Sequence, residues 1–269
     1  MNPNTAPLLI VTDLDGSLLD HHSYSWAAAE PCLNRLKQHN TPIMFCTSKT
    51  KPEVELLQQQ MGLTEQPYIC ENGAILATNQ QTSIIARQSS ALNYLEITRI
   101  LDQLKKKYHF HFSGFAHASL QEIMQWTGLS PLQAQFAKQR IASEPILWQD
   151  STDQFTQFQQ QLEQYQLCLI KGGRFWHVMN IGSNKGFALS HFLQQEQQQG
   201  RYWQTIGLGD SPNDLPLLEV TDFSVIIQSA QSQNILLQRK DSSHIYYSRH
   251  SGPTGWCEGL SFFTNHLNL

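Results

Sequence analysis

The sequence lacks any long hydrophobic run, and no stretch approaches the roughly 18 apolar residues of a membrane span. Its N-terminus has no basic region and only a four-residue apolar run, which argues against a signal peptide. Basic stretches are also short: the only basic run, Lys105–Lys107, is expected to close a solvated helix end. With a formal net charge of −4, these absences exclude nucleic acid and membranes as expected partners.

Cysteine is sparse and scattered. The five residues are odd in number and include no Cys-x-x-Cys pair: Cys32, Cys46, Cys70, Cys168 and Cys257. This pattern argues against a disulfide framework or a zinc site and predicts reduced thiols in a cytoplasmic protein.

The chain of 269 residues instead alternates short apolar runs with helical patterns at both ends. Such alternation predicts an α/β fold with a parallel sheet. The expected strands are Leu8–Val11, Pro42–Cys46, Tyr68–Cys70, Ala74–Ala77, Trp203–Leu208 and Phe223–Ile227. The expected helices are Ser25–His39, Lys51–Met61, Lys185–Gln199 and Asp214–Val220.

In the middle of the chain, the expected helices and strands do not alternate in the same way. This predicts an inserted α+β domain at residues 86–180 between core segments 1–85 and 181–269. Its expected helices are Ala91–Lys107, Pro131–Ser143 and Asp153–Tyr165, and its expected strands are Glu144–Trp148, Gln166–Lys171 and Arg174–Met179. The dipeptide Gly172-Gly173 predicts a hairpin turn between the last two strands.

Two carboxylates follow the first strand. Residues two apart in an extended chain point the same way, so Asp13 and Asp15 can face one site. Two like charges at such a short distance are unfavourable unless a cation or a shared proton compensates them. The pair therefore suits metal-assisted phosphoryl transfer, although an Asp-rich turn is an equally simple interpretation.

Three further segments carry polar groups next to predicted strands or helices. Thr47–Thr50 follows a strand, where the start of a helix can bind phosphate, although Thr50 also suits an ordinary N-cap. Lys185 begins a helix and is either a solvated charge or a phosphoryl ligand. Gly209–Asp214 holds Asp210, Asn213 and Asp214 on a glycine-flanked turn, which suits Mg2+ better than a plain loop does. Because the carboxyl ends of parallel strands share one edge, these segments can converge.

These segments, in this order, resemble the four motifs of the haloacid dehalogenase (HAD) superfamily. The matching residues are Asp13-Leu14-Asp15-Gly16-Ser17, Thr47, Lys185, and Gly209-Asp210 through Asn213-Asp214. Only Ser17 departs from the usual residue, threonine, and it keeps a hydroxyl group. The resemblance implies a Rossmann-like core with an inserted cap.

Further segments narrow the resemblance to the mannosyl-3-phosphoglycerate phosphatase family. They are Thr47–Thr50, Glu71–Gly73, Trp126–Ser130, Arg140–Pro145, Gly172–His177 and Gly252–Trp256, and together they span core and insert. The family implies hydrolysis of mannosyl-3-phosphoglycerate to mannosylglycerate and phosphate, a step of mannosylglycerate biosynthesis. The expected partner is thus a small phosphorylated sugar.

The same resemblance implies the catalytic roles. Asp13 would attack phosphorus and form an aspartyl-phosphate, Asp15 would act as acid and base, and Thr47 and Lys185 would hold the phosphoryl oxygens. Mg2+ would be bound by Asp13, Asp15 through its backbone carbonyl, and Asp210. Asp214 would either bind it directly or, with Asn213, orient its ligands from behind.

Substrate binding would fall to Ser48, Lys49, Arg140 and Arg174, because guanidinium groups bind carboxylates such as that of phosphoglycerate. Each arginine also has a purely structural interpretation. The same holds for His177, Trp176 and Trp256, for which packing is the simpler role.

Three alternative functions remain open. The chain could be a phosphatase for another sugar or polyol phosphate, since specificity resides in the cap. It could be a sugar phosphomutase, which shares the aspartyl-phosphate step. A non-catalytic phospholigand-binding module is the third, but the presence of both Asp13 and Asp15 argues against it.

Overall fold

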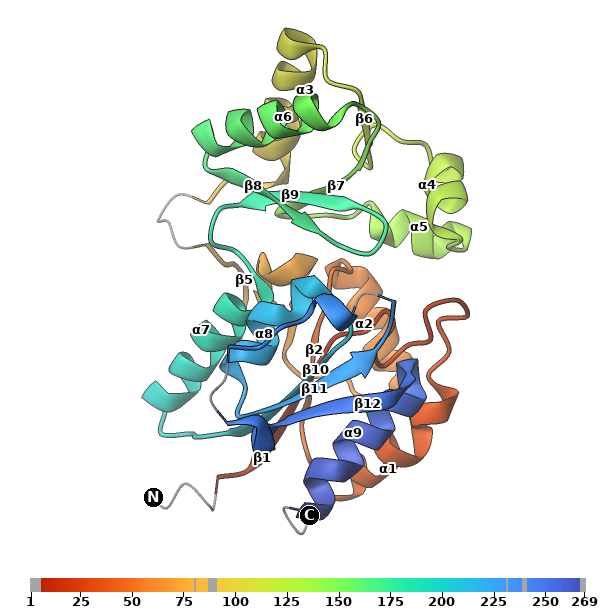
Figure 1. Cartoon of the computed structure of the whole chain (residues 1–269), viewed down its shortest axis with the longest axis vertical. Helices are drawn as coiled ribbons and strands as arrows, with labels where there is room; N and C mark the ends of the chain where they lie inside the picture. Colours follow the sequence, from red (N-terminus) through yellow and green to blue (C-terminus); the bar gives the residue numbers. More distant parts are fainter. Residues whose placement is uncertain (1–5, 80, 87–90, 231, 239–240, 267–269) are drawn as a thin grey trace. The chain divides into compact units, whose positions relative to one another are not determined.

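The computed structural model describes residues 6–79, 81–86, 91–230, 232–238 and 241–266, in which strands alternate with helices (Figure 1). The chain divides into two compact units. Unit 1 comprises Met1–Thr47, Glu65–Ile69 and Asn184–Leu269, and unit 2 comprises Ser48–Thr64 and Cys70–Ser183. The predicted α/β class with a mostly parallel sheet is confirmed.

Within the described ranges, eight strands make up the larger sheet, in the order β12-β11-β10-β1-β2-β3-β4-β5. Their bounds are β1 (Leu8–Thr12), β2 (Ile43–Cys46), β3 (Tyr68–Cys70), β4 (Ile75–Ala77), β5 (Thr82–Ile84), β10 (Gln204–Gly209), β11 (Phe223–Gln228) and β12 (Ile245–Ser251). The strands from β12 to β3 pair in parallel, and β5 pairs antiparallel with β4.

Strand β1 lies in the middle of the parallel strands, between β2 and β10. All five of its residues are buried. This explains its unbroken apolar run, because a strand covered by helices on both faces has no solvent side to alternate with.

Helices of unit 1 cover the two sides of its parallel strands (Figure 1). Their bounds are α1 (Glu30–Gln38), α7 (Lys185–Gln198), α8 (Leu215–Val220) and α9 (Gly252–His266). Helix α9 packs against α1, β11 and β12, whereas α7 packs against α8. The arrangement is a doubly covered sheet, whose carboxyl edge is the usual place for ligands.

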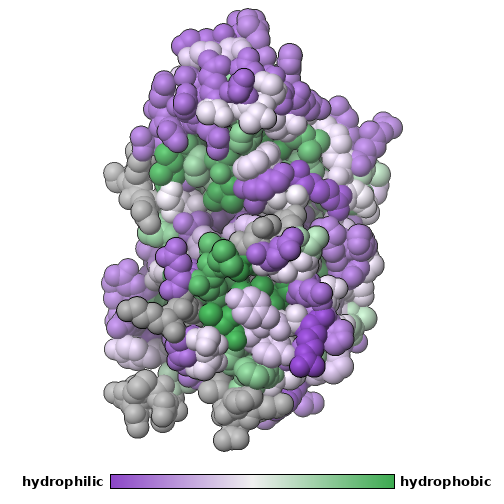
Figure 2. Space-filling model, in the orientation of Figure 1, coloured by the Kyte–Doolittle hydropathy of each residue, from purple (hydrophilic) through white to green (hydrophobic). Residues whose placement is uncertain are grey.

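The face of the molecule drawn in Figure 2 is mostly hydrophilic, with smaller hydrophobic patches. No helix within the described residues is both long and apolar enough to cross a bilayer.

A second sheet belongs to unit 2 and has the order β6-β7-β9-β8, with antiparallel pairing throughout. Its strands are β6 (Phe112–Gly114), β7 (Ser143–Trp148), β8 (Leu167–Lys171) and β9 (Trp176–Asn180). The helices of unit 2 are α2 (Lys51–Met61), α3 (Tyr94–Tyr108), α4 (Leu120–Thr127), α5 (Pro131–Ala137) and α6 (Thr152–Gln164). The hairpin expected at Gly172-Gly173 is confirmed, since it joins β8 to β9.

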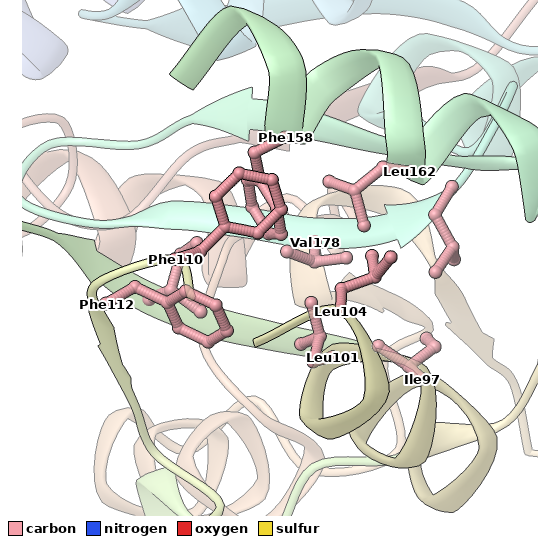
Figure 3. Close-up of a cluster of buried hydrophobic side chains, with 10 residues drawn as sticks. Ile97, Leu101, Leu104, Phe110, Phe112, Phe158, Leu162 and Val178 are labelled. Carbon is pink, nitrogen blue, oxygen red and sulfur yellow. The ribbon is translucent and has the colours of Figure 1, made fainter. Parts of the chain in front are cut away.

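An aromatic and aliphatic core holds this second sheet to its helices. Side chains from α3 and α6 point toward one another and toward Val178 of β9 (Figure 3). Phe158 is fully buried there, and its ring lies 5.2 Å from that of Phe110 and 5.4 Å from that of Phe112. Apolar residues at helical spacing on α3 and α6 thus form an apolar core separate from that of the parallel sheet.

The prediction of a helix over Pro131–Ser143 is wrong in its last turns, because α5 ends at Ala137. Two backbone N–H groups beyond it, those of Ile141 and Ala142, donate to the Glu71 carboxylate at 2.7 and 3.1 Å. A side chain outside the segment therefore replaces the helical hydrogen bonds. The sequence pattern also did not predict α4, α9, β5, β6 and β12.

The predicted domain boundaries, 1–85 with 181–269 and 86–180, remain a prediction. The division by contact groups α2 with the second sheet, and residues 87–90, next to the first boundary, lie outside the described residues.

The prediction that all five cysteines are reduced is wrong for one pair. Cys32 of α1 and Cys257 of α9 form a disulfide across a sequence separation of 225 residues. The spacing of cysteines could not reveal this bond because the two residues meet only through the packing of α9 against α1. It also weakens the cysteine-based argument for a cytoplasmic protein.

We expect reduction of this disulfide to lower the free energy of unfolding by about 2–5 kcal/mol, because the bond restricts a long loop in the unfolded chain. Denaturant titration with and without dithiothreitol measures the difference. The matched control is Cys32→Ser/Cys257→Ser, whose midpoint should not respond to dithiothreitol. An equal response in wild type and the double variant would show that the bond adds nothing to stability.

Candidate active site

The strand register brings three predicted site residues to one edge of the sheet. Thr12, the last residue of β1, pairs with Phe45 of β2 and with Leu208 of β10. Asp13 follows Thr12 directly, while Thr47 and Asp210 lie two residues beyond those partners. Thr47 and Asp210 are therefore level with each other on either side of the β1 end, and all three side chains belong to unit 1.

A buried lysine joins the first and last motifs. The Lys185 Nζ, at the start of α7, lies 2.6 Å from the Asp13 Oδ1 and 2.5 Å from the Asp214 Oδ1. Lys185 is 1 % exposed and Asp214 is fully buried. A lysine in that position is not the solvated surface charge that a lone lysine usually is.

Asp214 is held from several sides. Its Oδ2 accepts hydrogen bonds from the backbone N–H groups of Asp210 and Ser211, each at 3.1 Å. With Lys185 on the other oxygen, both oxygens of this carboxylate are bonded to protein. This favours the predicted role in which Asp214 orients the metal ligands from behind rather than binding the metal directly.

The cluster carries more negative than positive charge. Three buried carboxylates, of Asp13, Asp210 and Asp214, can each place an oxygen within 4.8 Å of the other two. Lys185 supplies one ammonium against them, so three charges less one leave a formal charge of minus two. Burial of unbalanced charge is unfavourable, and protonation or a cation can relieve it.

The pKa values of two carboxyls show the same imbalance. Burial, with the nearby Asp214 charge next, raises the pKa of Asp13 to about 7, against the opposing effect of Lys185. Burial and the charges of Asp214 and Asp13 raise the pKa of Asp210 to about 8. Burial opposes the charge on Lys185, but Asp13 and Asp214 outweigh it and raise the pKa of the ammonium.

These residues fit a hard divalent cation. Carboxylate oxygens are the ligands that Mg2+ prefers, and a doubly charged ion matches the excess charge of the cluster. The loop after Asp13 passes close to the Asp210 carboxylate, since a Cβ atom on Gly16 would lie 2.7 Å from the Asp210 Oδ2. Gly16 has a φ of +84°, so both its backbone and its lack of a side chain suit the position.

Asp15 lies in the tight loop that follows β1. The loop is closed by hydrogen bonds from the Leu19 N–H to the Leu14 carbonyl at 2.8 Å and from the Gly16 N–H to the Leu19 carbonyl at 2.9 Å. Asp15 is partly buried, whereas Asp13 is buried. The pair is therefore not a solvated Asp-rich turn.

The predicted substrate-binding residues belong to unit 2. The guanidinium of Arg140 is buried and donates to the Ser48 carbonyl and the Ser143 Oγ, both at 3.0 Å from Nη2. Arg174 is exposed, and its Nη1 donates to the Thr127 carbonyl at 2.9 Å. The Lys49 carbonyl accepts from the Glu71 N–H at 2.9 Å. Arg140 is thus already engaged by protein groups, and Arg174 is the more accessible cation.

Sequence reasoning did not single out Ser229, whose Oγ donates to the Asp210 carbonyl at 2.7 Å. It also did not connect Ser17 to Asp210, although the Ser17 Oγ lies 3.4 Å from the Asp210 Oδ1. Serines are common in loops, so only their neighbours in the fold identify these two.

Comparison with known proteins agrees with this geometry. Residues 10–237 match the family model described as haloacid dehalogenase-like hydrolase. Among solved structures, the sucrose-phosphatase of Synechocystis sp. PCC6803, in complex with sucrose and phosphate, is similar at 19% identity and a TM-score of 0.61, with 98% of each chain covered.

Two further structures are similar over nearly their whole length. A phosphatase of the haloalkanoate superfamily from Bacteroides thetaiotaomicron is 15% identical with a TM-score of 0.66, covering 99% of this chain and 97% of that one. A protein of Thermoplasma acidophilum is 17% identical with a TM-score of 0.65, covering 98% and 99%. At these identities the likeness concerns the fold.

The raised pKa values predict how stability depends on pH without metal. Between the ordinary carboxyl pKa near 3.8 and the raised pKa values of about 7 and about 8, folded Asp13 and Asp210 keep protons that the unfolded chain has released. The free energy of unfolding therefore falls as pH rises through that window. In EDTA we expect a lower Tm at pH 8 than at pH 6, and Mg2+ should raise Tm more at pH 8.

Asp210→Asn should reduce the pH slope of Tm in EDTA and the Mg2+ response. Asp153→Asn, which removes an exposed carboxyl on α6, is the matched control and should behave as wild type. Thermal unfolding scans at three pH values measure both. Equal slopes for wild type and Asp210→Asn would contradict the assignment of the titrating group.

Proposed function

The chain belongs to the haloacid dehalogenase-like hydrolase family, and we propose that it is a Mg2+-dependent phosphatase acting on mannosyl-3-phosphoglycerate. Asp13 is the nucleophile and forms an aspartyl-phosphate intermediate. The products are mannosylglycerate and phosphate, which would place the enzyme in mannosylglycerate biosynthesis.

One observation carries the phosphatase assignment: the buried Asp13 carboxylate is bonded to Lys185 within a cluster that has two negative charges in excess. A structural ion pair would be balanced. An excess of buried carboxylates instead favours a site built for a cation and a phosphoryl group, since the cation offsets the repulsion between two anions.

The proposed role of each residue is the one that the family resemblance implies. Asp13 attacks phosphorus and displaces the alkoxide of the substrate, and the Asp15 side chain donates the proton that this alkoxide needs. Asp15 then removes a proton from the water that hydrolyses the aspartyl-phosphate. Lys185 keeps the Asp13 carboxylate oriented and, with Thr47, binds phosphoryl oxygens.

Asp13, the backbone carbonyl of Asp15, and Asp210 would hold Mg2+, with Asp214 fixing their arrangement through Lys185 and the Asp210 N–H. When bound, the ion supplies charge neutralisation that allows the carboxylate and the phosphate to approach each other.

The substrate assignment rests on the resemblance of segments in core and insert to the mannosyl-3-phosphoglycerate phosphatase family. Phosphoglycerate carries a carboxylate, which needs a cation, and Arg174 is exposed and able to offer a guanidinium. Ser48 and Lys49 are proposed to assist. We assign Arg140 a supporting role, because its guanidinium already bonds the Ser48 carbonyl and Ser143.

Another sugar phosphate is the second candidate. The similar Synechocystis structure is a sucrose-phosphatase, so a neutral sugar phosphate without a carboxylate is a reasonable alternative substrate for the same core.

Asp13→Asn should abolish phosphate release, to less than about 10⁻³ of the wild-type kcat, because an amide cannot form the acyl phosphate. Phosphate release from a phosphorylated substrate measures kcat, and thermal shift with Mg2+ and substrate measures binding, which should persist. Undiminished turnover by this variant would refute the mechanism.

A substrate panel separates the candidates. Wild type should release phosphate from mannosyl-3-phosphoglycerate at a higher kcat/KM than from sucrose 6-phosphate or glucose 6-phosphate. Arg174→Gln should raise KM about tenfold for the carboxylate substrate but leave p-nitrophenyl phosphate unaffected. Arg99→Gln, an exposed arginine on α3, is the control.

Equal turnover of all sugar phosphates would refute the substrate assignment and leave the phosphatase assignment standing. Conversion of a hexose 1-phosphate to the 6-phosphate without free phosphate would instead indicate a mutase.

A further inference from the structure

A buried tryptophan from the end of the chain reaches the residue next to the nucleophile. The Trp256 indole, on α9, is fully buried. Its Nε1 donates a hydrogen bond of 2.8 Å to the Thr12 Oγ1, across 244 residues of sequence. The burial rules out stacking of this ring on a sugar, which the sequence had left open.

The hydrogen bond continues to Asp13. The Thr12 Oγ1 donates to the Asp13 carbonyl oxygen at 2.7 Å. A hydroxyl has a single proton, so accepting from the indole N–H leaves that proton for the carbonyl. The chain from indole to hydroxyl to carbonyl therefore has one direction. Because the peptide is planar, it fixes the orientation of the bond between Asp13 and Leu14.

The start of α9 is itself fixed to its neighbours. The Glu258 carboxylate accepts from the Arg249 N–H at 3.0 Å and from the Tyr246 hydroxyl at 2.7 Å, both on β12. Cys257 is joined to Cys32 of α1 by the disulfide. Trp256, directly before Cys257, thus projects from a segment that is held on two sides.

We infer that Trp256 is a positioning residue for the nucleophile and acts through Thr12; this inference rests on the proposed phosphatase function. Lys185 holds the Asp13 side chain at 2.6 Å, and the Trp256–Thr12 pair holds the Asp13 backbone. A carboxylate that must attack phosphorus in line needs both restraints, since small misplacements of reacting groups are costly.

The test compares four variants by steady-state phosphate release. Trp256→Phe and Thr12→Val should each lower kcat about tenfold with KM within about twofold, because they loosen the nucleophile without touching substrate. The double variant should lose no more than about tenfold in total, because both changes break one chain of hydrogen bonds. Thr12→Ser, which keeps the hydroxyl, should retain kcat within about twofold.

Trp203→Phe is the matched control. The Trp203 Nε1 also donates a hydrogen bond, at 3.0 Å to Glu196, but Trp203 precedes β10, at the opposite end of that strand from Asp210. This variant should lose stability without losing kcat. If Trp256→Phe does not fold, the contrast between Thr12→Val and Thr12→Ser decides the question.

The outcomes separate the two proposals. A wild-type protein without phosphatase activity refutes the proposed function and the positioning role with it. An active wild type whose Trp256→Phe and Thr12→Val variants keep kcat, or whose Thr12→Ser variant fails as badly as Thr12→Val, refutes only the positioning role.

Discussion

The candidate site depends on one buried lysine shared between two carboxylates. Lys185 bonds Asp13 and Asp214, which come from opposite ends of the chain, and it is nearly inaccessible to solvent. Removing such a cation would leave buried like charges facing one another, so the lysine is a condition for the other groups to be there. Its single charge does not balance three carboxylates, and this deficit suits a site that binds a cation.

Parallel pairing explains how so few contacts assemble the site. Thr12 pairs with Phe45 and Leu208, so the segments after three strands emerge at one level, and each contributes a polar side chain. Strands β1, β2 and β10 are buried and mostly apolar, and Asp13, Thr47 and Asp210 each follow the last residue of one of them. The predicted catalytic side chains therefore lie in the loops at the edge, while the sheet sets the spacing between those loops.

The parts of the structure visible in the sequence were those with strong local signals. Apolar runs ending in Asp13, Thr47 and Asp210 located the parallel strands and their edge, and helix positions followed from capping and periodicity. The disulfide between Cys32 and Cys257, the contacts of Arg140 and the bond from Trp256 to Thr12 were not visible. Each joins residues far apart in sequence, and each residue type has a commonplace local interpretation.

The end of helix α5 was also not predictable from the local sequence. Its pattern runs on to Ser143, yet the helix stops at Ala137 because the Glu71 carboxylate accepts the hydrogen bonds of the following backbone. Local propensity cannot anticipate a competitor supplied from about 70 residues away.

The position of β1 has a consequence for synthesis on the ribosome. Among the described strands this one is synthesised first, and β2 can pair with one side of it early. Its other side pairs with β10, from Leu8 with Gln204 to Thr12 with Leu208, and must await most of the chain. Until then a strand that is apolar except for Thr12 exposes one unpaired hydrogen-bonding edge. During synthesis, β1 is therefore exposed to aggregation until β10 is available to pair with it. We expect shielding by chaperones to matter most before α7 and β10 have left the exit tunnel.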